Sequence, residues 1–331
     1  MDLRQSMFKA RTTAPTSLTD SGDPASSSGE YQPLSWSDYF EDKKTVSAPD
    51  STLFNVYASG LANTTGPLFV LHHGAGHSGL TFGLAAKHIM QLEPQATVIA
   101  PDARGHGLTT GPDEETLSLK QLVSDCTLIT KAFLGDKQRD TALVGHSMGG
   151  AVVAHVAASR QIPRVTGLVL IDIVEGSAMD SLHAIPGFIA ARPHTFKSVS
   201  SAIKWHVDSD AIQNLQSARL SVPSLITQQS DNDLWTWRTQ LLPTEKFWRG
   251  WYLGLSKTFI GAPTAKLLVL AGTDRLDKEL LIAQMQGRFQ LDLLPAAGHT
   301  IQEDLPDRIA GIIVSFWKRN QPLNIPVRRL H

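Results

Sequence analysis

Short apolar runs alternate with longer amphipathic stretches along most of this chain. The runs read LFNVYASG, LFVLHHG, TVIAPD, TALVGH, GLVLIDIV, KLLVLAGTD and FQLDLLPAAGH. Apolar residues at successive positions indicate strands covered on both faces, and the alternation predicts βα crossovers. The pattern therefore predicts an α/β fold with a mostly parallel central sheet and helices on both faces. Functional residues of such a sheet belong at the carboxyl ends of its strands.

Two segments depart from this pattern. Residues 12–34 are rich in Ser, Thr, Pro, Asp and Gly and poor in large apolar groups, so residues 1–34 are expected to form a flexible tail. One domain is then expected over residues 35–331. Between Ile173 and Lys266 the sequence contains no convincing strand. An excursion of this length between two strands predicts an inserted, mainly helical cap at about residues 175–263.

The expected cap holds four of the seven tryptophans, Trp235, Trp237, Trp248 and Trp251. Two interpretations stay open. The indoles can anchor an amphipathic cap to the core, or some of them can form a recognition surface for a partner, because aromatic side chains with arginine suit interface hot spots.

Composition and charge narrow the class of protein. The 331 residues, 42% of them hydrophobic, are enough for one large α/β domain. The formal net charge of −1 provides no basic field for a phosphate backbone, so a nucleic-acid partner is not expected. No apolar stretch approaches the roughly 20 residues of a membrane span. The single cysteine, Cys126, excludes an internal disulfide, and together with the absence of a secretory-type N-terminus it favours a cytoplasmic or nuclear location.

The motif GxSxG occurs as Gly145 to Gly149 in TALVGHSMGG, with Ser147 at its centre. A strand-like run precedes it and a helix-like stretch, GAVVAHVAASR, follows. Glycines two before and two after the serine allow a sharp strand-to-helix turn that lifts the hydroxyl above the sheet edge. Ser147 is the candidate nucleophile.

A serine nucleophile needs a histidine base and an acid that orients it, in the chain order Ser, acid, His for this architecture. The last apolar run ends in AAGH, which places His299 on a loop at the expected edge of the sheet. The acid is ambiguous, because Asp172 follows one strand on this edge while Asp274 and Asp277 follow the next. Spacing alone does not choose among the three.

The stretch HHGAGHSG at residues 72–79 has two interpretations. It satisfies GxGxxG, and a second strand ends in Asp102 about 20 positions beyond it, as in a dinucleotide-binding unit. The oxidoreductase interpretation leaves GHSMGG and AAGH unexplained, whereas a hydrolase uses all three motifs. In a hydrolase, backbone N–H groups of Gly74, Ala75 and Met148 form the oxyanion hole.

Two smaller groups of polar residues lie in or near this stretch. His72, His73 and His77 lack a further ligand at metal spacing, so no metal site is expected there. Asp102 and Arg104, in DARGHG, are expected to brace their loop and not to react.

With these motifs in place, the chain resembles the protein phosphatase methylesterase family, serine hydrolases with the α/β-hydrolase fold. GHSMGG is shared by many hydrolases, but the blocks DIVEGSAMD, DRLDKEL with QMQG, and LPAAGHTIQEDLPD are narrow. The resemblance runs from about PLSWSDYFE to the last helix. Two departures are the loop HGAG, where HGGG is expected, and a less clear match over residues 228–262.

The resemblance implies a function and a triad. It places the triad acid at Asp172, which opens the DIVEG block, beside Ser147 and His299. It implies hydrolysis of the methyl ester on the C-terminal leucine of the type 2A protein phosphatase catalytic subunit, without metal or organic cofactor. A general carboxylesterase of the same fold is one alternative, and a protein that mainly binds the phosphatase is another.

Overall fold

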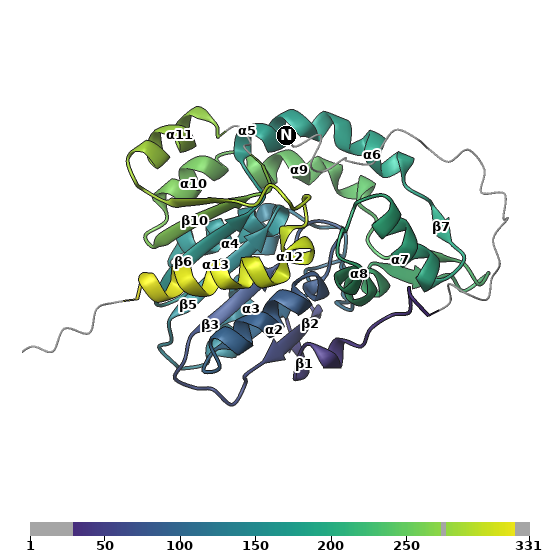
Figure 1. The fold of residues 1–331 in the computed structure, drawn as a ribbon, viewed down its shortest axis with the longest axis horizontal. Coiled ribbons are helices and arrows are strands. Elements are labelled where there is room, and N and C mark those ends of the chain that lie inside the picture. The colour runs from purple at the N-terminus through teal and green to yellow at the C-terminus, as the bar shows by residue number, and fades with distance from the viewer. Residues whose placement is uncertain (1–28, 273–275, 322–331) are drawn as a thin grey trace, which may run out of the picture.

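A central eight-stranded sheet organises the molecule, which was obtained as a computed structural model that describes residues 29–272 and 276–321. Its strands lie in the order β1-β2-β4-β3-β5-β6-β10-β11 (Figure 1). All neighbours from β4 to β11 are parallel, whereas β2 is antiparallel to both β1 and β4. The strands are β1 (Asp42–Ser47), β2 (Leu53–Ser59), β3 (Leu68–His72), β4 (Thr97–Pro101), β5 (Thr141–His146), β6 (Val165–Ile171), β10 (Ala265–Leu270) and β11 (Gln290–Leu293).

Helices cover both faces of this sheet, because its inner strands are apolar on both sides. In β3, Leu68 and Val70 face one hydrophobic cluster while Phe69 and Leu71 face the other. The first cluster lies under α3 (Leu119–Leu134), α4 (Met148–Ser159) and α10 (Leu255–Gly261); the second lies under α2 (Gly83–Leu92), α12 (Ile301–Asp304) and α13 (Pro306–Arg319). The 3-10 helices η1 (Trp36–Asp38) and η2 (Gly79–Phe82) and helix α11 (Lys278–Met285) complete this part of the chain.

The predicted α/β fold with a mostly parallel sheet is confirmed, and each of the seven apolar runs forms a strand. The sequence pattern missed β1, whose residues DKKTVS are mostly polar and exposed. This strand lies at the edge of the sheet, where charged side chains discourage pairing with other chains. The sequence of β1 therefore has no apolar periodicity that would indicate a strand.

The segment between β6 and β10 lies along one side of the sheet (Figure 1) and is mostly helical. The expectation that it contains no strand was wrong, because β7, β9 and β8 form a small antiparallel sheet. These strands have two or three residues each, too few for alternation to show in the sequence. Before α10, which ends it, the segment comprises α5 (Glu175–Ser181), η3 (Leu182–Ala184), α6 (Ile185–Ala191), β7 (Thr195–Phe196), α7 (Val199–Asp208), α8 (Leu215–Ser221), η4 (Val222–Ser224), β8 (Ile226–Gln228), β9 (Trp235–Trp237), η5 (Leu242–Thr244) and α9 (Glu245–Tyr252).

The tryptophans of this segment divide into two groups. Trp248 and Trp251, on α9, are both only 3% exposed, and the Trp251 indole N–H donates to the carbonyl of Leu117 at 2.6 Å. They anchor α9 to the core, as one of the two interpretations predicted. Trp235 and Trp237, on β9, are only partly buried.

The expected N-terminal tail falls mainly on residues 1–28, which lie outside the described residues. Its last positions differ from the expectation, because they pack against the inserted segment. The N–H of Leu34 donates to the carbonyl of Arg219 at 3.0 Å, and the Arg219 guanidinium donates to the carbonyl of Gln32 at 2.6 Å. The ammonium group of Lys204 lies 5.5 Å from the centroid of the Tyr31 ring.

Candidate active site

Ser147 lies on the turn between β5 and α4 in a backbone conformation that L residues rarely adopt, with φ 51° and ψ −119°. The flanking glycines make this turn possible. A Cβ atom at Gly145 would lie 2.2 Å from the carbonyl oxygen of Gly149, and one at Gly149 would lie 2.3 Å from that of His72. Both glycines of GxSxG are therefore required by close backbone contacts, as expected of a strained nucleophile turn.

His299 and Asp172 come together at the same edge of the sheet. Asp172 follows β6 and His299 lies on the loop after β11, and the Asp172 Oδ2 atom accepts a hydrogen bond from His299 Nδ1 at 2.7 Å. The other carboxylate oxygen, Oδ1, accepts from the N–H of Ala271 at 2.9 Å. Asp172 is fully buried, and each oxygen of its carboxylate has a hydrogen-bond partner.

The other candidate acids have different positions. Asp277 is the N-cap of α11, where it accepts from the N–H of Leu280 at 2.9 Å and from the hydroxyl of Ser256 at 2.5 Å. Its role in the structure is to cap a helix. Asp274 lies outside the described residues.

Ser147 and His299 both line a cavity of about 320 Å³ beneath the inserted segment. No hydrogen bond joins their side chains among the described residues, and catalytic pairs are often loosely aligned before substrate binds. Most of the lining is apolar or aromatic, and it includes Leu182, Ile185, Phe188, Ile189, Leu225, Leu241, Trp205, Trp237, Trp248, Trp251 and Tyr252. Such a cavity suits an apolar side chain next to an ester.

The loop after β3 packs directly against the nucleophile. A Cβ atom at Gly74 would lie 3.2 Å from the Cβ of Ser147, and Gly74 and Ala75 both line the cavity. Met148 is the first residue of α4, and the N–H of a first helical residue has no acceptor within its helix. Of the three residues expected to form the oxyanion hole, Gly74 and Met148 thus lie beside Ser147, and Ala75 lines the same cavity.

Two buried histidines hold this loop against the loop after β4. His73 Nδ1 donates to the carbonyl of Gly74 at 2.7 Å, and its Nε2 accepts from the N–H of Ala103 at 2.9 Å. His106, on the loop after β4, connects the same two loops, because its Nε2 accepts from the N–H of Gly76 at 2.9 Å. Burial lowers the pKa of His106 to about 4 and that of His73 well below its usual value. Both rings are neutral braces of the loop.

Asp102, which the dinucleotide interpretation needs for a ribose, is fully buried and already has partners. Its oxygens accept from the N–H groups of Gly79 at 2.7 Å and Leu108 at 2.9 Å and from the amide of Asn55 at 2.8 Å. Arg104 makes a bidentate contact with Asp125 at 3.0 Å. The prediction that Asp102 and Arg104 brace their loop is confirmed.

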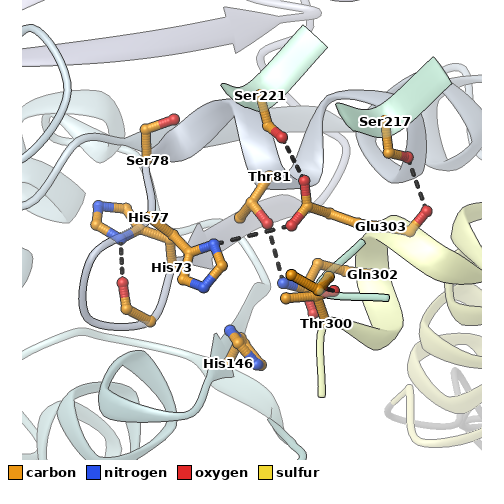
Figure 2. A network of polar contacts seen from close by, with 12 residues as sticks. His73, His77, Ser78, Thr81, His146, Ser217, Ser221, Thr300, Gln302 and Glu303 are labelled. Atoms are coloured by element: carbon orange, nitrogen blue, oxygen red, sulfur yellow. Dashed lines mark hydrogen bonds and ion pairs between the residues drawn. The ribbon is translucent and has the colours of Figure 1, made fainter. Parts of the chain in front are cut away.

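A buried polar network that the sequence did not indicate lies behind the loop after β3. Figure 2 shows Glu303 between helix α8 and His77. One carboxylate oxygen, Oε1, accepts from the hydroxyl of Ser221 at 2.5 Å, and the Glu303 carbonyl accepts from Ser217 at 2.7 Å. The other oxygen, Oε2, lies 3.8 Å from His77 Nδ1, too far for a hydrogen bond.

Charge is nearly absent from this network at neutral pH. Burial raises the pKa of Glu303 to about 8, and burial together with the charge of His299 lowers the pKa of His77 to about 3. The contact between them is therefore not an ion pair. The His77 ring packs edge-on against His146, which in turn lies 4.6 Å from His299 between ring centroids. Glu303 follows His299 by four residues in TIQED, but no periodicity marks it.

Comparisons with known proteins show the family to which the chain belongs. The family described as Alpha/beta hydrolase family matches residues 69–312. Protein phosphatase methylesterase 1 of Aspergillus fumigatus is 44% identical over 310 residues, covering 88% of this chain and 74% of that protein. Probable protein phosphatase methylesterase 1 of Caenorhabditis elegans is 42% identical over 320 residues, covering 96% of this chain and 85% of that protein.

Among solved structures, E-2-(acetamidomethylene)succinate hydrolase superposes with a TM-score of 0.67 at 21% identity, covering 84% of this chain and 99% of that chain. At this identity the likeness concerns the fold alone. None of the helices in the described part of the chain is long and apolar enough to cross a bilayer.

Proposed function

The chain belongs to the protein phosphatase methylesterase family of α/β-hydrolases, and on this premise we propose that it acts on the type 2A phosphatase catalytic subunit, whose C-terminal leucine methyl ester it hydrolyses. It is a carboxylic ester hydrolase. The observation that carries the proposal is the 2.7 Å contact between Asp172 and His299 beside Ser147 on its strained turn.

In the proposed mechanism Ser147 is the nucleophile and His299 the general base. Asp172 holds the imidazole in the tautomer whose Nε2 can take the serine proton, and it stabilises the imidazolium that forms. The hydroxyl oxygen attacks the ester carbonyl, and backbone N–H groups of the loop at Gly74 and Ala75 and of Met148 stabilise the oxyanion. His299 then protonates the departing methoxide, so methanol leaves an acyl-enzyme, and water activated by His299 releases the leucine carboxylate.

The cavity supports a leucine ester as substrate. Its lining is mostly apolar and includes Ser147, so a branched apolar side chain can be buried next to the reacting carbonyl. A methyl ester provides few atoms for recognition, so selectivity must come from the peptide and from the phosphatase surface. A cytoplasmic or nuclear location fits the free, buried Cys126, which a reducing compartment keeps as a thiol.

Methanol release from the methylated type 2A catalytic subunit tests the proposal. Wild type should release methanol in proportion to loss of the ester, and Ser147→Ala should release none. Release from short generic esters at equal efficiency, with no preference for the phosphatase, would instead favour a general carboxylesterase. Tight binding of the methylated subunit by folded wild type without methanol release would favour a binding protein.

A further inference from the structure

A guanidinium group lines the substrate cavity at the end of α6. Arg192 follows the last residue of that helix, and its Cζ atom lies 4.1 Å from the centroid of the Trp237 ring. The indole is itself fixed, because its Nε1–H donates to the carbonyl of Pro193 at 2.8 Å. Stacking on an immobile indole holds the plane of the guanidinium in one orientation.

This cation has no anionic partner among the described residues. No carboxylate of the described chain lies within ion-pair distance of Arg192, and its Nε atom is buried without an acceptor. The acidic residue of the cavity lining, Asp210, is exposed and does not pair with it in the part of the chain that the structure describes. Burial lowers the pKa of Arg192 to about 10, which still leaves it charged at neutral pH.

The surroundings of Arg192 do not supply the missing negative charge. The nearby histidines His77 and His206 are neutral, since burial lowers their pKa values to about 3 and about 4, with a smaller effect from Arg192 itself. A partly desolvated guanidinium without a hydrogen-bond acceptor is costly. A bidentate carboxylate is the group that offsets this cost best, because its two oxygens match the fork of N–H donors.

We propose that Arg192, held on the face of Trp237, binds a carboxylate of the peptide that occupies the cavity. This inference rests on the proposed function, because the ester itself is uncharged. The carboxylate then has two sources. It belongs either to an acidic side chain upstream of the esterified leucine or to the leucine α-carboxylate that hydrolysis creates.

Inhibition of p-nitrophenyl acetate hydrolysis tests the site without relying on peptide ester turnover. The inhibitors are acetyl-Ala-Ala-Ala-Leu with a free α-carboxylate and the same peptide as its C-terminal amide. If the site takes the product carboxylate, wild type should bind the acid about 10- to 100-fold more tightly than the amide, the range for a hydrogen-bonded charge. Arg192→Gln should abolish the difference and Arg192→Lys should retain part of it.

A second arm tests an upstream acidic side chain. The kcat/KM for the methyl ester of acetyl-Ala-Ala-Ala-Leu is compared with that of versions carrying Asp or Asn at each of the three alanines. A preference for Asp over Asn that Arg192→Gln removes would identify the side chain as the ligand. Arg249→Gln, which alters an exposed arginine on α9, is the matched control and should preserve any preference.

The outcomes separate the two proposals. No preference for a carboxylate in either arm, or one that survives in Arg192→Gln, overturns the site. Turnover of p-nitrophenyl acetate by the variants shows that they are folded, and Trp237→Phe provides a second, milder perturbation of the same site. If wild type leaves the methylated phosphatase and all peptide methyl esters intact, the proposed function fails, while the inhibition arm still reports on Arg192.

Discussion

The Oδ2 atom of Asp172 lies 2.7 Å from Nδ1 of His299, although 127 residues separate them in the chain. The two residues follow different strands, and the parallel sheet brings the carboxyl ends of these strands to one edge. The inserted segment lies between them in sequence, and β10 lies between their strands in the sheet.

Replacing Asp172 by Asn should lower kcat for methanol release by about ten-thousand-fold, because an amide favours the wrong tautomer of the histidine. The KM should change little, since Asp172 is fully buried below the cavity. Steady-state methanol release at several substrate concentrations measures both values.

Asp277→Ala is the matched control for this experiment. Asp277 caps α11, so the substitution should lower the free energy of unfolding by about 1 kcal/mol and leave kcat unchanged. If Asp277→Ala lowered kcat as far as Asp172→Asn does, the assignment of the triad acid would be wrong.

Gly145→Ala should disrupt the nucleophile turn. The added Cβ would lie 2.2 Å from the carbonyl oxygen of Gly149, so the backbone must move, at a cost of roughly 1–3 kcal/mol in unfolding free energy. Displacing Ser147 by even about 1 Å should lower kcat about 100-fold. Urea denaturation and methanol release provide the two readouts.

Gly311→Ala in α13 is the control for the turn. A Cβ atom there meets no atom within 4 Å, so it should raise the free energy of unfolding by up to about 1 kcal/mol through helix propensity and leave activity unchanged. Equal losses in both variants would show that the close contact at Gly145 is not the cause.

Glu303→Gln should remove a pH dependence of stability above pH 6.5. The pKa of Glu303 is raised from its usual 4.5 to about 8, so the folded protein holds this proton while the unfolded chain has lost it. Its stabilising contribution is complete below the unfolded pKa and is lost as pH rises toward 8, with a slope of at most about 1.4 kcal/mol per pH unit.

Comparison of wild type with Glu303→Gln isolates this carboxyl. The buried histidines are neutral in the folded protein but partly protonated in the unfolded chain near pH 6.5, and the pKa of Asp102 is raised to about 6. These groups contribute equally to the pH dependence of both proteins. Between pH 6.5, 7.2 and 8 the urea midpoint of wild type should fall relative to that of Glu303→Gln, because only wild type loses the contribution of the protonated carboxyl. Parallel curves for the two proteins would contradict the prediction.

Trp248→Ala should lower the free energy of unfolding by about 3–5 kcal/mol, because the indole is 3% exposed and its N–H donates to Thr244 at 2.9 Å. A large buried side chain contributes to packing of the core and not to a docking surface. Thermal or urea denaturation measures the loss. The neighbouring exposed position provides the control, since Arg249→Gln should change stability by less than about 0.5 kcal/mol.

Local patterns were sufficient to predict most strands of the sheet and the residues at the carboxyl ends of these strands. Each apolar run became a strand because burial on both faces requires it, and the spacing of Gly145, Ser147 and Gly149 was enough to identify the turn. The short strands of the inserted segment and the polar edge strand β1 were missed, since neither has an apolar periodicity.

What the sequence by itself determined is the set of groups placed at the carboxyl edge of the sheet, because strand order along the chain and turn chemistry are local properties. The tertiary structure decided which of them meet. Asp172 and Asp277 follow neighbouring strands and are equivalent by spacing, but only Asp172 reaches His299, while Asp277 caps a helix. The tertiary structure also placed Arg192 on Trp237 and Glu303 behind His77, because contacts between distant segments depend on how the inserted segment packs over the sheet.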